Sequence, residues 1–113
     1  MSQMITTRDF SSFHEKNVAK ALSGVRTSNS GATALTKGDV IVGNCLIECK
    51  TKMSEAKSFS IQKEWLDTIE RERREMGKHM CAVAFSFDVG KSSYYVIDER
   101  MMKRLVELIN NDE

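Results

Sequence analysis

The segment 38–50, GDVIVGNCLIECK, has the pattern of a β-hairpin. Two short runs of β-branched and other apolar residues flank Gly43 and Asn44, and a Gly/Asn pair favours a tight turn between antiparallel strands. The apolar side chains of such a hairpin must be covered by other elements, so the segments on either side decide the fold class.

Three segments have the apolar periodicity of helices. The first helix is expected to end at Gly24, and Asp9 or a nearby serine is a candidate cap at its start. The second lies within 59–76 and ends at Gly77, and the third spans 99–110 after a cap at Asp98. Each helix is expected to face inward with its apolar residues. In the first helix these are Phe10, Phe13, Val18, Ala21, Leu22 and Val25. In the second they are Ile61, Trp65, Leu66, Ile69 and Met76, and in the third Met101, Met102, Leu105, Val106 and Ile109.

Two further strands are expected at 81–87 and 93–97, because both segments are rich in apolar, β-branched and aromatic residues and a turn separates them. The element order is then α-β-β-α-β-β-α, which predicts an α/β fold with a mixed, four-stranded central sheet flanked by helices. The chain has 113 residues and no proline, repeat or low-complexity tract, so we expect a single domain spanning residues 1–113.

The composition excludes several classes of protein. With 41% hydrophobic and 29% charged residues, the chain is neither disordered nor collagen-like. No apolar run approaches the roughly 20 residues that a membrane-spanning helix requires, and the N-terminal segment lacks the apolar stretch of a signal peptide. We therefore expect a soluble, cytoplasmic protein with no membrane partner. The three cysteines, Cys45, Cys49 and Cys81, cannot all pair within one chain and are expected to be reduced, buried thiols.

Two carboxylates and an ammonium group are expected to converge at one end of the hairpin. Alternation along the second strand places Glu48 and Lys50 on one face, and the turn at 43–44 folds Asp39 back beside Glu48. Carboxylates at this separation repel each other, and a divalent cation relieves the repulsion; oxygen ligands with open water positions suit Mg²⁺ or Mn²⁺. Such an ion would activate water and neutralise charge on a phosphodiester, while Lys50 would orient the water or stabilise the developing anion.

A longer set of residues surrounds this cluster in a defined order. It runs Phe13-His14-Glu15-Lys16, Arg26, Ser30-Gly31-Ala32, Asp39-Val-Ile-Val-Gly, Ile47-Glu48-Cys49-Lys50, Gln62 with Leu66 four residues later, Gly77, and Ala82-Val-Ala-Phe85. The set covers roughly residues 10–97 and resembles the PD-(D/E)xK nuclease superfamily, and within it the archaeal-type Holliday-junction resolvases. One departure is Gly38, which stands where the motif has proline; the chemistry requires only the carboxylate of Asp39.

The resemblance implies a restriction-endonuclease-like fold and a metal-dependent endonuclease, usually a homodimer, that resolves four-way DNA junctions by paired nicks. By position in the motif, Asp39 and Glu48 would be ligands of Mg²⁺ or Mn²⁺, and Lys50 would be the catalytic lysine. Glu15 would complete the metal site, and Gln62 would be a supporting polar group. Other members of the superfamily cut duplex DNA, flaps or ends, so a repair or restriction-type nuclease remains open. A catalytically inactive nucleic-acid-binding module with the same fold is the alternative from another class.

Contacts with DNA are expected from the first half of the chain. Between His14 and Lys52 there are six basic and three acidic residues, a modestly cationic balance. The segment 27–37 has the composition of a loop, and backbone amides and hydroxyls in such a loop hold phosphates without reading bases. Its alternative is a surface loop without a role. The residues expected to contact DNA are Arg26, Ser30, Gly31, Lys37 and Lys52.

Some of these residues also have purely structural interpretations, without a role in catalysis or binding. Glu48 and Lys50 can form a solvated cross-strand ion pair, worth less than about 1 kcal/mol. Glu15 lies at the flank of the first helix's apolar stripe, where a solvated boundary glutamate is the alternative, and Gln62 can be an ordinary helix-surface residue. His14 projects near the middle of that stripe and is expected to be a hydrogen-bonded, partly buried side chain rather than a ligand.

A homodimer needs an exposed surface for its interface. The exposed side of four aromatic residues, Phe85, Phe87, Tyr94 and Tyr95, is one candidate. The third helix is methionine-rich, and its apolar residues are interpreted as core or dimer packing.

Overall fold

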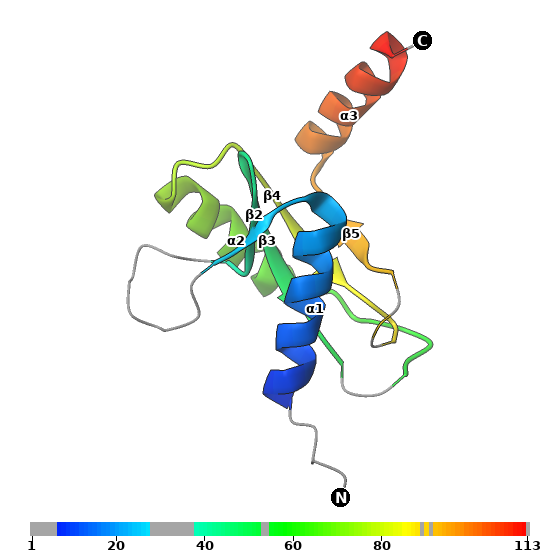
Figure 1. Ribbon diagram of the computed structural model, residues 1–113. Coiled ribbons are helices and arrows are strands. Elements are labelled where there is room, and N and C mark those ends of the chain that lie inside the picture. Colours follow the sequence, from blue (N-terminus) through cyan, green and yellow to red (C-terminus); the bar gives the residue numbers. More distant parts are fainter. Residues whose placement is uncertain (1–6, 28–37, 53–54, 89, 91, 113) are drawn as a thin grey trace, which may run out of the picture.

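The computed structural model describes residues 7–27, 38–52, 55–88, 90 and 92–112. The described residues form three helices and five strands, labelled in Figure 1: α1 (Thr7–Leu22), β1 (Val25–Arg26), β2 (Val40–Val42), β3 (Cys45–Lys50), α2 (Lys63–Glu75), β4 (Met80–Phe85), β5 (Tyr94–Val96) and α3 (Glu99–Asn111). The strands form one sheet in the order β1-β2-β3-β4-β5, in which β3 and β4 are parallel and the other neighbours antiparallel. The predicted α/β fold with a mixed central sheet flanked by helices is confirmed.

The hairpin forms where the sequence predicts it. Strands β2 and β3 pair antiparallel on either side of Gly43 and Asn44. Gly43 has a φ of +56°, a conformation that glycine adopts without steric cost. The same register, continued by one residue, places Asp39 opposite Glu48, and the Asp39 N–H donates to the Ile47 carbonyl at 2.9 Å.

Helices α1 and α2 pack on opposite faces of the sheet (Figure 1). Alternate residues of β3 point to opposite sides, so Ile47 belongs to the core that includes Val18 of α1, whereas Leu46 packs with Ile69 of α2. These four side chains are almost completely buried. Packing on both faces holds β3 firmly, and Glu48 and Lys50 follow directly on this buried stretch.

The first helix is shorter than predicted and is followed by a strand that the sequence pattern did not predict. Helix α1 ends at Leu22, and Val25, predicted on its apolar face, lies in β1 and is 70% exposed. Because β1 pairs with β2, the sheet has five strands in the described residues rather than four. Gly24 permits this pairing, since a Cβ there would lie 2.7 Å from the Val42 side chain. Asp9 lies inside α1 and not at a cap position.

The other helices begin and end close to the predicted residues. Helix α2 ends at Glu75, and Gly77 follows with a φ of +70°, the left-handed conformation that commonly terminates a helix. The carboxylate of Asp98 caps α3 by accepting the Met101 N–H at 2.8 Å. The glycine that ends α2 and the cap of α3 were therefore predicted correctly.

The prediction that the apolar residues of α3 face inward is wrong. Helix α3 has no buried residue, and Figure 1 shows it extending away from the sheet and the other two helices. No other helix or strand in the described part of the chain packs extensively against it. Its exposed apolar side chains are Met102, Leu105, Val106, Leu108 and Ile109.

Two predictions from composition can be compared with the structure. The cysteines are free thiols, as expected, although each is only partly buried. Among the residues that the structure describes, no helix has both the length and the apolar character needed to cross a membrane.

Candidate active site

Backbone contacts on several sides fix Asp39 just before β2. Its N–H donates to the Ile47 carbonyl at 2.9 Å, and its carbonyl accepts the Thr27 N–H at 3.0 Å. The preceding N–H, that of Gly38, donates to the Glu72 carboxylate on α2 at 3.0 Å. Asp39 is thereby held between β3, the end of β1 and α2.

Gly38 is required by the turn that leads into Asp39. It has a φ of +69°, which side chains rarely adopt. A Cβ at this position would lie 2.7 Å from the side chain of Leu46, which is completely buried and cannot move aside. Glycine therefore allows the chain to approach Leu46 closely where the resembled motif has proline.

The strand register places Asp39 opposite Glu48, so that the charge of each carboxyl group affects the other. Asp39 Oδ2 accepts the backbone N–H of Cys49 at 2.8 Å. Burial raises the pKa of Asp39, and burial together with the negative charge of Asp39 raises the pKa of Glu48 to about 8. Both pKa shifts favour the protonated form of the carboxyl group.

Lys50 lies two residues beyond Glu48 on the same side of β3. Its Nζ is 3.8 Å from Glu48 Oε1 and 4.7 Å from the centroid of the Trp65 ring. An ammonium group over an indole face gains roughly 0.5–2 kcal/mol, so Trp65 restricts where Nζ lies. About a quarter to a third of each charged side chain remains exposed, 26% for Glu48 and 30% for Lys50. Both groups are thus held by packing and still reach solvent.

Glu48 and Lys50 line one wall of an open cleft of about 270 Å³ on the α2 side of the sheet. The other wall consists of five residues of α2: Glu64, Trp65, Thr68, Ile69 and Glu72. The α2 wall carries the carboxylates Glu64 and Glu72, and the β3 wall carries the ammonium group of Lys50, so the cleft presents charges of both signs.

Glu15 reaches the neighbourhood of Asp39 from α1. Only 8% of Glu15 is exposed, and its Oε1 pairs with Arg26 Nη2 at 3.0 Å, so the solvated interpretation of Glu15 is wrong. Its negative charge raises the pKa of Asp39 and of Cys49, although burial is the larger cause for both. Arg26, expected to contact DNA, thus compensates the charge of Glu15.

The described carboxylates can be compared with the set of ligands that a divalent metal ion requires. Among the described residues, no group of three or more His, Cys, Asp or Glu side chains is placed to hold a metal. Asp39 and Glu48 offer two neighbouring carboxyl groups. Mg²⁺ is commonly bound through one or two carboxylates, several waters and a phosphate of the substrate, so the chemistry of this donor set is compatible with Mg²⁺ or Mn²⁺.

The remaining candidate residues lie apart from this cluster. Gln62 is exposed at the N-cap of α2 and makes no side-chain cap hydrogen bond. Lys52 is exposed, and its Nζ donates to the Ser58 carbonyl at 2.9 Å and lies 4.9 Å from the Phe59 ring centroid. Ser30, Gly31 and Lys37, with most of the expected DNA-contact loop, lie outside the described residues.

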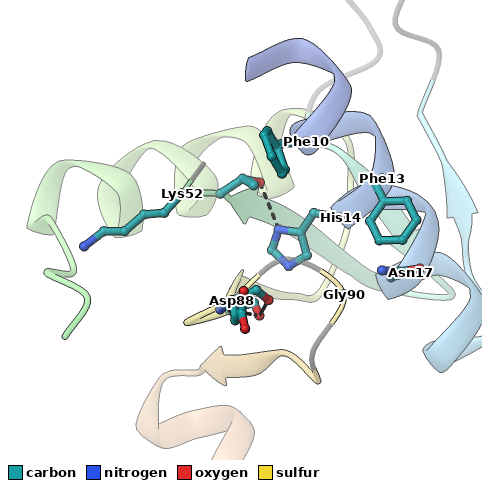
Figure 2. A pocket seen from close by; sticks show the side chains of 9 residues that line it. Phe10, Phe13, His14, Asn17, Lys52, Asp88 and Gly90 are labelled. Carbon is teal, nitrogen blue, oxygen red and sulfur yellow. Dashed lines mark hydrogen bonds between the residues drawn. The ribbon is translucent and has the colours of Figure 1, made fainter. Parts of the chain in front are cut away.

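His14 is buried and hydrogen-bonded, as predicted. Its Nδ1 lies 3.0 Å from Thr51 Oγ1, and its Nε2 lies 3.0 Å from Ser93 Oγ. Figure 2 shows the ring pointing from α1 into a small pocket, while the Lys52 side chain extends away from it. The pocket holds only about 10 Å³, enough for roughly one water molecule. His14 therefore connects α1 with the ends of β3 and β5 and has no room beside it for a substrate.

Two residues that contact the site, Trp65 and Glu72, were not predicted from the sequence to belong to it. Trp65 was assigned to the apolar stripe of its helix, and Glu72 was not singled out within a charged helical segment. The sequence spacing does place Trp65 and Glu72 on one face of α2, seven residues apart. That face contacts Lys50 and Gly38 only because α2 lies across β3.

Comparison of the chain with models of known protein families, with curated proteins and with solved structures finds no match.

Proposed function

We propose that this protein is a metal-dependent endonuclease that hydrolyses DNA phosphodiesters. The observation that carries the proposal is the pair formed by Asp39 and Glu48, which lie opposite each other on neighbouring strands, with Glu48 partly buried beside Lys50 at the wall of an open cleft. A simple ion pair between Glu48 and Lys50 does not account for Asp39, whose charge opposes the ionisation of Glu48. Holding a second carboxyl group in this position costs stability, and a cation-dependent reaction gives it a use.

The residues have separate roles in this proposal. Asp39 and Glu48 hold Mg²⁺ or Mn²⁺, which when bound lowers the pKa of a coordinated water and neutralises charge on the phosphate. Lys50 donates a hydrogen bond to the oxygen on which negative charge develops. Trp65 keeps the Lys50 ammonium group above its ring and close to the metal ligands.

We further propose a four-way DNA junction as the substrate, cut by paired nicks in a homodimer. The support is the ordered set of motif residues between positions 10 and 97, together with the small, polar composition of 28–37 directly before Asp39. Two symmetric nicks require two copies of the site, and a twofold dimer is the commonest way to supply them.

Cleavage of four labelled substrates in Mg²⁺ tests both levels of the proposal: a four-way junction, a flap, a linear duplex and single-stranded DNA. Paired nicks on the junction alone support a resolvase. Equal cutting of the linear duplex supports a repair or restriction-type nuclease and contradicts the junction assignment. Absence of cleavage on all four in Mg²⁺ and in Mn²⁺ contradicts the nuclease assignment itself.

Variants then test the site. Asp39→Asn and Lys50→Ala should each reduce cleavage by at least about 100-fold while the circular dichroism spectrum stays unchanged. Glu55→Gln is the matched control, because it neutralises an exposed carboxylate outside the cleft. Cleavage at the wild-type rate in both active-site variants would refute the assignment.

A further inference from the structure

Five aromatic side chains form a continuous cluster that adjoins the cleft at Lys50 and Trp65. Lys50 lies opposite Phe85 on β4, and Phe85 lies opposite Tyr94 on β5. Residues opposite each other on neighbouring strands point to the same side of a sheet, so Phe85 and Tyr94 share the α2 side with Lys50. The aromatic cluster consists of Phe59, Trp65, Phe85, Phe87 and Tyr94, with neighbouring ring centroids 4.9–6.2 Å apart.

The segment before α2 is fastened to the end of β4, and this holds the aromatic cluster together. The Ala56 N–H donates to the Phe87 carbonyl at 2.9 Å, and Lys52 Nζ donates to the Ser58 carbonyl at 2.9 Å. Phe59 follows directly and contacts both Trp65 and Phe85. The rings are therefore ordered before any ligand binds, which lowers the entropic cost of binding.

The aromatic cluster is open to solvent at one end. Tyr94 is 58% exposed, whereas the other four members are partly buried. The Tyr94 ring stacks on Phe85 and meets the edge of Phe87. An exposed ring with this support offers a rigid, flat surface to a planar ligand.

Lysines lie on the aromatic cluster itself. Lys50 Nζ is 4.7 Å from the centroid of the Trp65 ring, and Lys52 Nζ is 4.9 Å from that of the Phe59 ring. Segment 50–63 contains four lysines and a single acidic residue, Glu55. Lys52 is exposed and forms no ion pair with the described residues. The surface thus combines exposed aromatic rings with uncompensated positive charge, as in proteins that bind single-stranded nucleic acids.

A second copy of the chain fits this surface less well than a nucleic acid does. The sequence suggests a dimer interface at Phe85, Phe87, Tyr94 and Tyr95, but these residues do not share one face. Tyr95 lies opposite Ala84 of the α1-side core and lines a groove beside α1. A twofold contact through the remaining rings would bring the lysines of both copies onto one surface, where like charges repel.

We propose that the aromatic cluster binds single-stranded DNA, with unpaired bases stacked on Tyr94 and Phe87 and the phosphates directed toward Lys52. Stacking accepts every base, so this surface recognises an unpaired strand and not a sequence. Because Trp65 and Lys50 belong to both the aromatic cluster and the cleft, a strand held here continues toward Glu48. The choice of DNA over RNA rests on the proposed function; the stacking itself requires neither metal nor cleavage.

Fluorescence anisotropy in EDTA tests the proposal with two labelled probes, an oligothymidylate of about 15 nucleotides and a blunt hairpin duplex. The wild type should bind the single strand at least about tenfold more tightly. Tyr94→Leu should weaken that binding at least about fivefold, because it removes a stacking ring, whereas Tyr94→Phe should bind like the wild type. Tyr95→Leu is the matched control: it makes the same change one residue along β5, on the opposite face, and should leave binding unchanged.

The salt dependence of binding tests the cationic part of the surface. Lys52→Gln should reduce the slope of log K against log salt concentration by about 0.7, the value for one phosphate contact with a single strand. Lys20→Gln removes the same charge from an exposed position on α1 and should leave the slope unchanged. An equal change of slope in both variants would show that the strand does not lie over the aromatic cluster.

Three binding results would each overturn the proposal: equal affinity for the two probes, wild-type affinity in Tyr94→Leu, or equal losses in Tyr94→Leu and Tyr95→Leu. Sedimentation equilibrium without DNA examines the other occupant, since a dimer that Tyr94→Leu dissociates would assign the surface to a second copy. Single-strand binding without cleavage of any substrate would contradict the proposed nuclease function and support this inference. Cleavage without single-strand binding would overturn this inference alone.

Discussion

Replacing Glu48 by glutamine should stabilise the protein while abolishing cleavage. The pKa of the Glu48 carboxyl is raised from 4.5 to about 8, first by burial and then by the charge of Asp39. At about 1.36 kcal/mol per pH unit, this difference in pKa sets an upper limit of about 5 kcal/mol on the stabilisation gained when the charge of Glu48 is removed. Because 26% of the side chain is exposed and solvent screens part of the interaction, we expect a measured gain of roughly 2–3 kcal/mol at pH 8. Glutamine retains a hydrogen-bond donor for Asp39 and has no charge to bury.

The sign of the pH dependence follows from the direction of the pKa. With a raised pKa in the folded state, Glu48 contributes its full stability below pH 4.5, and that contribution is lost as the pH rises through about 8. The free-energy difference between Glu48→Gln and wild type should therefore be close to zero at pH 4.5 and grow steadily to pH 8. Urea unfolding in EDTA, followed by the fluorescence of the single tryptophan, measures it.

Two comparisons make the result decisive. Glu55→Gln, at an exposed position, should show no such growth with pH. Millimolar Mg²⁺ or Mn²⁺ should stabilise the wild type at pH 8 and leave Glu48→Gln unaffected, because an ion that binds only the folded state stabilises it. A difference between Glu48→Gln and wild type that stays constant from pH 4.5 to pH 8 would refute the reasoning about the buried pair.

Three further predictions concern residues around the site. Burial lowers the pKa of His14 in the folded protein, so the free energy of unfolding should decrease as the pH falls below about 6.5. His14→Gln should abolish this decrease in urea titrations between pH 5 and 7. Trp65→Leu should reduce cleavage about tenfold through kcat, with Trp65→Phe retaining most activity; equal rates for the two variants would exclude a cation–π role. Gly38→Ala should lower the free energy of unfolding by about 2–4 kcal/mol, because its Cβ meets buried Leu46 at positive φ, and an unchanged urea midpoint would contradict the structure there.

The hairpin could be predicted from the sequence because its determinants are local. Gly43 and Asn44 define the turn, and a two-residue turn fixes which residues face each other on β2 and β3. The proximity of Asp39 and Glu48 follows from that register alone. The caps at Gly77 and Asp98 were equally local and were predicted correctly.

The interactions missed from the sequence all depend on the tertiary arrangement. Val25 continues the apolar periodicity of α1, and only its pairing with β2 places it in a strand. Helical spacing identified the apolar face of α3 and could not show that the other described elements leave it exposed. The contact between Glu72 and Gly38 joins residues 34 positions apart, for which a charged helical segment gives no signal.

Strand β1 explains how another carboxylate, Glu15, is accommodated in the neighbourhood of Asp39. The strand has only two residues, yet it directs Arg26 onto Glu15 at 3.0 Å and leads into Thr27, whose N–H holds the Asp39 carbonyl. The charge of Glu15 adds to burial in raising the pKa of Asp39, and Arg26 offsets that charge, since an uncompensated buried charge costs several kcal/mol. With Arg26 paired to Glu15, the carboxylates divide into an ion pair on the α1 side and the neighbouring Asp39 and Glu48, of which Glu48 lines the cleft. The short strand therefore favours a proposed metal site that uses two carboxylates and leaves Glu15 in its ion pair.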